Sequence, residues 1–333
     1  MTRIDIFSGF LGAGKTTLIR KLINEGYKGQ KLVLIENEFG EIAIDGGFLK
    51  DAGVQITEMN SGCICCTLVG DFTKALKKVM DDYAPDRIII EPSGVGKLSD
   101  VAKAVEHVEG AHIGAKVTVV DAGKCRMYMR NFGEFFNDQV ENADLIVMSR
   151  TDITPEAKVQ TAADMLRTLN HDAGLITTPL DKISGEQILE AMDKNGLRAQ
   201  MEELEHEHEH HHHDHHDHDD DDDDDDCCCG HDHEHHHHHH ADEVFTSWGM
   251  ETPRKFTEES LKKILEALDE SAVYGTILRA KGIVDASDGD WLYFDYTPGE
   301  YDVRRGNAAV TGRFCVIGSK LNEQALKELF EVE

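Results

Sequence analysis

Short apolar runs alternate with longer amphipathic segments over the first 180 residues of the chain. The runs predict buried strands at Arg3–Ser8, Lys31–Ile35, Arg87–Ile90, Lys116–Val120, Leu145–Met148 and Leu175–Thr178. Apolar residues between them recur at helical spacing, most clearly at Phe72, Ala75, Leu76, Val79, Met80 and Tyr83. Further helices are predicted over Thr16–Glu25 and from Pro155 to about Asn170. Strands that alternate with helices favour an α/β fold with a doubly wound, mostly parallel sheet over residues 1–200.

A second globular segment is predicted over residues 243–333. Leu261, Ile264, Leu265 and Leu268 mark a helix, and a final helix runs from about Asn322 to Phe330. Strands are expected at Tyr274–Ala280, Trp291–Tyr296 and Arg313–Ile317. The pattern indicates a small α+β domain, in which the sequence reveals no catalytic constellation.

Between these segments lies a tract, residues 201–242, with almost no apolar side chain. Residues 206–240 hold 17 of the 20 histidines and a run of eight aspartates, Asp219–Asp226. Because it cannot bury a core and repels itself, we expect it to be disordered. As a flexible coil, residues 206–240 would span roughly 30–35 Å, enough to reach back over the first domain. Its internal position argues against a purification tag, which would be terminal.

The net charge of −30 is unevenly distributed, because residues 206–240 contribute 14 acidic and no basic side chains, leaving −16 for the remainder. An acidic remainder argues against a nucleic-acid partner, which would require a basic face. No apolar run approaches the roughly 18 residues of a membrane span, and no signal-like pattern precedes the first strand. Eight cysteines, three of them nearly contiguous, do not resemble a disulfide framework. We therefore expect a cytoplasmic protein with working thiols and no membrane partner.

The first candidate site is a glycine-rich loop between the first strand and the first helix, in which residues 9–16 read GFLGAGKT. Its glycines allow backbone N–H groups to wrap phosphates, and the helix that begins there adds its positive dipole end. Lys15 is expected to reach the β- and γ-phosphates and the Thr16 hydroxyl to bind Mg2+. The predicted phosphate-binding residues are Gly9, Gly12, Ala13, Gly14, Lys15, Thr16 and Thr17.

Two further segments fit a nucleotide hydrolase. Residues 87–94, RIIIEPSG, place Glu91 at a strand end, where it would hold magnesium through water, and Gly94 where its amide could sense the γ-phosphate. With Lys15 and Thr16, Glu91 is a candidate catalytic residue; the alternative is a carboxylate that merely caps a strand. Residues 149–152, SRTD, match the position of the Asn-Lys-x-Asp element of GTPases. Asp152 would accept the guanine N–H bonds and the Arg150 stem would lie along the base, which favours GTP over ATP.

A cysteine cluster and an acidic segment are candidate metal ligands. Cys63, Cys65 and Cys66 are close enough for their thiolates to converge on one Zn2+, Co2+ or Ni2+ ion. Glu36 and Glu41 flank a segment, ENEFGE, that follows the second strand at the sheet edge where ligands bind. They are either metal ligands on a γ-phosphate switch or part of a solvated loop. His107 and His112 are isolated, and a surface role is expected for each.

The histidine tract is a third metal-binding candidate. Imidazoles bind Ni2+, Zn2+ or Co2+ near neutral pH, whereas a plain solvated charge run would need no histidine. Its densest groups are His210, His211, His212, His213 and His235, His236, His237, His238, with Cys227, Cys228 and Cys229 between them. The sequence does not reveal which metal is bound.

Together these motifs resemble the CobW-like family of P-loop GTPases, relatives of the nickel GTPases of hydrogenase and urease maturation. The likeness covers residues 9–17, 36–41, 63–66, 91–94 and 149–152, with Ser149 and Arg150 as departures, and extends to residues 275–282 and 314–318. It implies a GTPase that delivers metal ions, with zinc or cobalt the usual proposals. It also implies that the phosphate loop binds nucleotide and Mg2+, and that the cysteines with Glu36 and Glu41 bind the delivered metal.

Three functions remain open at this stage. In the leading one, a metallochaperone, GTP hydrolysis switches the cysteine site between holding a metal and releasing it to a client metalloprotein. The rival is a metal store whose nucleotide domain is regulatory, and a P-loop kinase or unrelated ATPase leaves the metal elements unexplained. The client and the assembly state, a homodimer included, are not fixed by the sequence.

Overall fold

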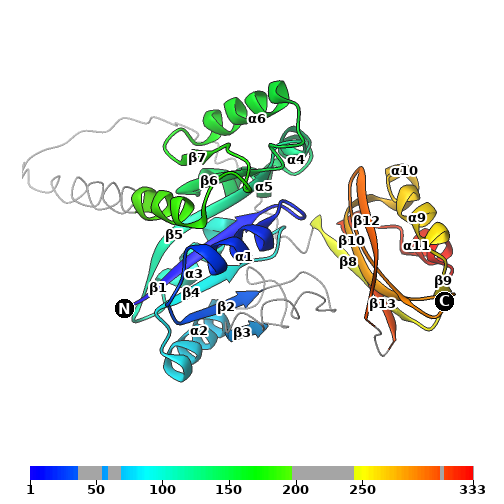
Figure 1. Cartoon of the computed structure of the whole chain (residues 1–333), viewed down its shortest axis with the longest axis horizontal. Coiled ribbons are helices and arrows are strands. Elements are labelled where there is room, and N and C mark those ends of the chain that lie inside the picture. Colours follow the sequence, from blue (N-terminus) through cyan, green and yellow to red (C-terminus); the bar gives the residue numbers. More distant parts are fainter. Residues whose placement is uncertain (37–54, 59–68, 197–243, 308–310, 333) are drawn as a thin grey trace, which may run out of the picture.

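A computed structural model of the chain describes residues 1–36, 55–58, 69–196, 244–307 and 311–332. Its described residues form two sheets, one in each globular segment (Figure 1). The strands of the first are β1 (Thr2–Gly9), β2 (Leu32–Glu36), β3 (Gln55–Glu58), β4 (Arg87–Glu91), β5 (Ala111–Asp121), β6 (Leu145–Ser149) and β7 (Gly174–Ile176). Its helices are α1 (Lys15–Glu25), α2 (Val69–Tyr83), α3 (Leu98–Glu106), α4 (Cys125–Asn131), α5 (Gly133–Glu141) and α6 (Glu156–Leu169), and residues 185–196 are also helical.

The first sheet is parallel throughout, in the order β3-β2-β4-β1-β5-β6-β7. The doubly wound fold expected from the sequence is thus confirmed. Because all strands run the same way, their carboxyl ends share one edge, where ligands bind in open α/β sheets. That edge carries Gly9, Glu36, Glu91, Asp121 and Ser149, the last residues of five strands.

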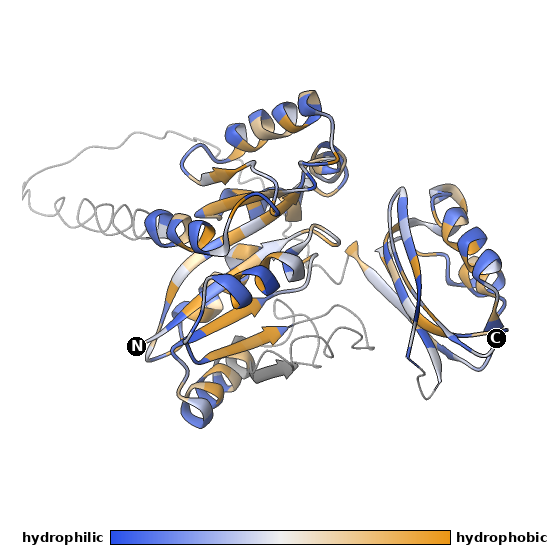
Figure 2. Cartoon of the chain, in the orientation of Figure 1, coloured by the Kyte–Doolittle hydropathy of each residue, from blue (hydrophilic) through white to orange (hydrophobic). Residues whose placement is uncertain are grey.

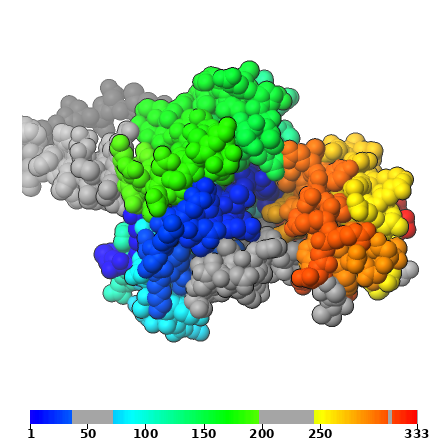
Figure 3. Space-filling view, viewed as in Figure 1, coloured from blue at the N-terminus to red at the C-terminus, as the bar shows by residue number. Residues whose placement is uncertain are grey.

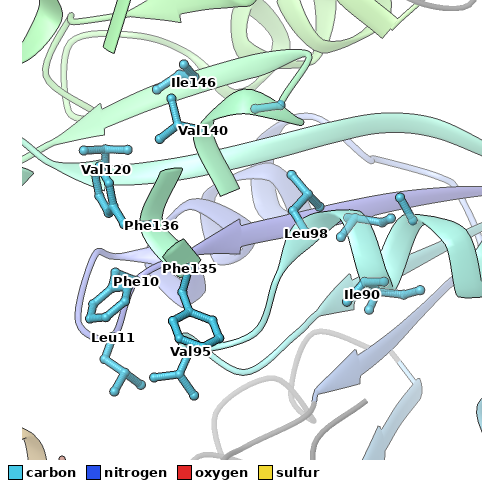
Figure 4. Packing of buried hydrophobic residues seen from close by; sticks show 14 of the residues in the cluster. Phe10, Leu11, Ile90, Val95, Leu98, Val120, Phe135, Phe136, Val140 and Ile146 are labelled. Carbon is cyan, nitrogen blue, oxygen red and sulfur yellow. The ribbon is translucent and has the colours of Figure 1, made fainter. Parts of the chain in front are cut away.

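Helices cover both faces of this sheet, and each face has its own apolar core (Figure 2). Leu18, Ile19 and Leu22 of α1 pack on one face with Ile188 and Met192. The other face is covered by α2 to α6, whose side chains join those of the strands and of the glycine-rich loop. Figure 4 shows this second core from close by; Phe10 and Leu11, both buried, lie against Val95 and Phe135. The loop therefore rests on a packed aromatic base.

The second sheet is mainly antiparallel, in the order β12-β11-β10-β13-β8, with β9 paired parallel to β10. Its strands are β8 (Thr246–Thr252), β9 (Lys255–Phe256), β10 (Thr276–Ala286), β11 (Trp291–Thr297), β12 (Glu300–Gly306) and β13 (Gly312–Ser319). The helices α9 (Glu258–Ala267), α10 (Ser271–Tyr274) and α11 (Glu323–Phe330) accompany it. Leu261 and Leu265 of α9 and Leu326 and Phe330 of α11 pack on one face of the sheet.

The other face of the second sheet packs on the first domain (Figure 3). Along β13, Phe314 and Val316 belong to the domain's own core, whereas the alternate residues Cys315 and Ile317 join the core of the first domain. Leu278 of β10 also joins the core of the first domain. Phe245 inserts among the aromatic rings of the first domain, with ring centroids 5.0 Å from Phe135 and 5.3 Å from Phe132. An apolar contact of this kind holds the two domains in a defined arrangement.

The sequence-based boundaries need a few corrections. The strand expected at Tyr274 begins at Thr276 instead, because Ser271–Tyr274 is a short helix that ends at Gly275 with φ +87°. The last parallel strand is Gly174–Ile176, shorter and earlier than the predicted Leu175–Thr178. Strands β3, β8, β9 and β12 were not predicted from the sequence. The tract at 201–242 and the cysteine cluster at 63–66 lie outside the described residues. Among the helices of the described segments, none is long and apolar enough to cross a membrane.

Candidate nucleotide and magnesium site

The glycine-rich loop connects β1 directly to α1. Gly12 and Gly14 adopt φ angles of +70° and +100°, a left-handed conformation that favours glycine and lets the loop turn back on itself. Gly14 forms the N-cap of α1 without a side-chain cap, so the first N–H groups of the helix are not occupied by a capping side chain. Lys15 is buried, and its Nζ donates to the carbonyl oxygens of Gly9 (2.9 Å) and Phe10 (3.4 Å). The ammonium group is therefore held across the loop.

Thr16 and Glu91 meet at the end of the loop, although they are 75 residues apart in sequence. The Thr16 Oγ1 donates to Glu91 Oε1 at 3.1 Å and lies 3.3 Å from Oε2. A hydroxyl and a carboxylate are hard oxygen donors of the kind that Mg2+ prefers. The two side chains predicted to serve magnesium thus lie together, and their chemistry fits that ion.

Gly94 lies against the glycine-rich loop. A Cβ built on Gly94 would approach the Leu11 backbone nitrogen to 2.7 Å and its Cα to 2.9 Å, closer than a real side chain permits. The turn is held from the other side by Gln139 of α5, whose Nε2 donates to the Gly96 carbonyl at 2.7 Å and the Gly94 carbonyl at 3.4 Å. Only glycine allows this approach of the two backbones.

The segment 149–152 lies at the same edge of the sheet. Ser149 Oγ donates to the Ala13 carbonyl at 2.6 Å, so the end of β6 is tied to the phosphate loop. Arg150 has a left-handed backbone with φ +56°, and its guanidinium lies 3.4 Å from the buried Asp121 carboxylate. Asp121 in turn accepts the backbone N–H groups of Gly123 and Lys124. Asp152 is exposed and lines the cavity described next.

Much of the glycine-rich loop, with Glu91 and the 149–152 segment, lines one cavity of about 870 Å³, large enough for a nucleotide. Gly9, Gly94 and Asp121 are not among the residues that line it. From the first domain it is lined by Gly12, Ala13, Gly14, Lys15, Thr16, Thr17, Glu91, Ser149, Arg150, Asp152, Ile153, Leu180 and Asp181. Leu180 and Asp181 escaped the sequence analysis, although their position just after the last parallel strand could have indicated them. The second domain supplies the remaining wall: Arg279, Asp295, Thr297, Glu300, Tyr301 and Asp302.

The second domain touches the loop and its neighbourhood through Thr297 and Glu300. A Cβ built on Gly12 would meet the Thr297 methyl group at 2.5 Å, and Lys124 Nζ donates to Thr297 Oγ1 at 2.7 Å. Glu300 forms an ion pair with Arg150 and lies 3.5 Å from Lys124 Nζ. Burial lowers the pKa of Lys124 to about 8, with the Arg150 charge acting in the same direction and the Asp121 carboxylate opposing it.

Among the residues predicted to bind the delivered metal, Glu36 lies in the part of the chain that the structure describes. It ends β2 and stands in register with Glu91 of β4 and with Glu58 at the end of β3. Glu41, the cysteines 63, 65 and 66 and the tract histidines lie outside the described residues. Within the described segments, no three His, Cys, Asp or Glu side chains cluster as metal ligands would. His107 and His112 are both exposed and on different elements, consistent with the surface role expected for them.

Comparison with protein families identifies both domains. Residues 3–177 match the nucleotide-binding domain of the CobW/HypB/UreG family, and residues 245–332 match the CobW C-terminal domain. The chain belongs to the CobW/HypB/UreG family. The family resemblance stated from the motifs is thereby confirmed, and the first domain is the nucleotide-binding domain of that family.

Curated relatives of this CobW/HypB/UreG-family chain share about a third of their aligned residues with it. Zinc chaperone YeiR of Escherichia coli strain K12 is 31% identical over 188 residues, which cover 56% of this chain and 57% of that protein. Zinc chaperone CobW of a Sinorhizobium species is 34% identical over 190 residues, covering 48% and 53%. The chain thus spans little more than half the length of these curated relatives. Among solved structures, the Zn(II)-bound YjiA GTPase from E. coli aligns with a TM-score of 0.43 at 22% identity, covering 99% of this chain and 98% of that one.

Proposed function

We propose that this chain binds and hydrolyses GTP and uses that cycle to deliver a divalent transition metal, in the first instance zinc, to a client metalloprotein. The observation that carries the proposal is the Thr16–Glu91 hydrogen bond of 3.1 Å, in one cavity with Lys15, on a sheet edge that also carries Glu36. A nucleotide site and the start of a candidate metal segment are therefore on adjacent strands. Zinc is favoured because the curated relatives that match are named zinc chaperones.

In the nucleotide half of the cycle, the phosphates lie along the N–H groups of Gly12, Ala13 and Gly14. The Lys15 ammonium moves from its loop carbonyls to the β- and γ-phosphates, which are stronger acceptors. Thr16 and Glu91 would hold Mg2+, which would supply positive charge to neutralise the phosphate oxygens. Asp152 accepts the guanine N–H bonds.

In the metal half, the cargo is held by the thiolates of Cys63, Cys65 and Cys66, with Glu36 and Glu41 as further ligands. The support is positional. Glu36 is in register with Glu91, one strand away from the carboxylate that faces the phosphate loop. The cysteine segment follows β3, which pairs with β2 on the other side. A change at the γ-phosphate is thus one strand from Glu36.

The tract collects divalent metal ions and passes them to the cysteine site, because its imidazoles and aspartates bind these ions more weakly than a thiolate cluster does. The cysteine site needs reduced thiols, and we therefore place the activity in the cytoplasm.

Deletion of residues 206–240 separates delivery from storage. The truncated protein should keep GTP hydrolysis and one tight, thiol-dependent zinc site, measured by zinc content and by competition with a chromophoric chelator. A cysteine-substituted full-length protein, with Cys63, Cys65 and Cys66 replaced by serine, is the matched counterpart and should lose that site while keeping the weaker tract sites. If truncation instead removes nearly all zinc binding, the chain is a metal store and the delivery proposal fails.

A further inference from the structure

The wall that the second domain contributes to the nucleotide cavity is fixed relative to the phosphate loop. Leu278, Cys315 and Ile317 pack into the core of the first domain, on the sheet face opposite α9 and α11. At the rim of this apolar contact, Thr297 abuts Gly12 and accepts a hydrogen bond from Lys124. Residues at the β11–β12 turn are therefore held at a constant position beside the cavity.

Glu300, the first residue of β12, lies in this fixed wall and forms an ion pair with Arg150. Arg150 also lies 3.4 Å from Asp121, whose carboxylate is buried and bound to backbone N–H groups. The guanidinium thus sits between two anchored carboxylates, one from each domain. Its neighbour Ser149 is held as well, because the Ser149 hydroxyl donates to the Ala13 carbonyl.

An unrestrained arginine would be a poor platform for a base. Its long side chain loses rotamer entropy when it is ordered, and 31% of the Arg150 side chain is exposed here. Charge-assisted bonds at the guanidinium, which is planar and bonds in fixed directions, restrict those rotamers before a ligand arrives. An ordered Arg150 stem then contributes stacking on the base at a smaller entropic cost.

We propose that Glu300 is a positioning residue that the second domain supplies to the base-binding site, and that it raises the preference for guanine by orienting Arg150 beside Asp152. The inference rests on the proposed GTP binding and deepens it. Guanine selectivity depends on the base being held in one orientation against the Asp152 carboxylate. Adenine has no paired N–H groups to offer that carboxylate, so it gains less from the same orientation.

The experiment measures the dissociation constants of fluorescent mant-GDP and mant-ADP for the full-length chain. The Glu300→Gln variant should lower the ratio of the ADP constant to the GDP constant by about three- to fivefold, the range open to a partly exposed ion pair. The matched control is Glu259→Gln, which breaks an exposed ion pair with Lys263 on α9 of the same domain and should leave the ratio unchanged.

A double-mutant cycle with Arg150→Met identifies the route of the effect, because methionine retains an apolar stem without a charge. Glu300→Gln should have no further effect on the ratio in that background. If Glu300 only holds the domains together, its removal will change both dissociation constants by the same factor, the ratio will stay constant, and the inference is wrong. If the unaltered protein shows no guanine preference, the proposed function itself fails, an outcome distinct from an unchanged ratio in a guanine-selective protein.

Discussion

Ser149 Oγ donates a 2.6 Å hydrogen bond to the carbonyl of Ala13, joining the end of β6 to the middle of the phosphate loop. From the sequence, serine at this position was a departure from the asparagine of the GTPase element. The contact shows that serine at this position connects the 149–152 segment to the glycine-rich loop. Both residues line the cavity, so the hydrogen bond joins two parts of its wall.

Removal of this tie should weaken nucleotide binding. We expect Ser149→Ala to lower GDP affinity by about threefold to tenfold, the worth of one buried hydrogen bond, as measured by titration calorimetry. The control is Thr161→Ala, which removes a hydroxyl-to-carbonyl bond of 2.7 Å on the exposed surface of α6. Equal GDP affinities in the two variants would show that the Ser149 bond does not support the site.

Gly94→Ala should disrupt the contact between the Gly94 turn and the phosphate loop. The new methyl group would lie 2.7 Å from the Leu11 backbone nitrogen, which cannot move without shifting the loop. We expect a loss of about 1–3 kcal/mol in the free energy of unfolding and a strong loss of GTP turnover. Gly133→Ala is the comparison, since its Cβ would meet Asn137 at an ordinary 3.5 Å. Turnover in Gly94→Ala equal to that in Gly133→Ala would contradict the assigned role.

The pKa of Lys124 can be checked directly. Burial lowers it to about 8 from an ordinary value of 10.5, so the unfolded chain binds more protons than the folded chain between these pH values. The free energy of unfolding should therefore gain a favourable contribution as pH rises from 8 to 10.5, relative to Lys124→Met. An NMR titration of the lysine side chains measures the pKa itself, and a value near 10.5 would show that Lys124 is solvated and not held against Thr297.

The sequence predicted most of the first domain because its signals are local, although β3 and the cavity residues Leu180 and Asp181 were missed. The loop motif predicts Lys15 and Thr16, and a strand followed by an acidic residue predicts Glu91. The parallel sheet then brings Thr16 and Glu91 together, since both follow strands whose carboxyl ends share one edge. Glu300 and Thr297 could not be foreseen, because they reach the site through packing between domains. No periodicity or spacing records that Cys315 and Ile317 face the first domain while Phe314 and Val316 face their own.

Lys15→Ala should abolish nucleotide binding, because the β- and γ-phosphates then lack their ammonium partner. Lys21→Ala on the same helix removes a partly buried ion pair with Glu25 and should bind GTP normally. Mant-GTP fluorescence measures both variants. Unchanged affinity in the Lys15 variant would refute the phosphate-site assignment.

Control of metal affinity by the nucleotide state can be measured by zinc titration. Zn2+ is titrated into protein lacking residues 206–240, loaded with GDP or with a non-hydrolysable GTP analogue. We expect zinc dissociation constants that differ by about fivefold or more between the two states, and an equal factor when nucleotide is titrated into zinc-free and zinc-loaded protein. Identical zinc affinities in the two states would mean that the sites are independent, and would contradict the proposed delivery cycle.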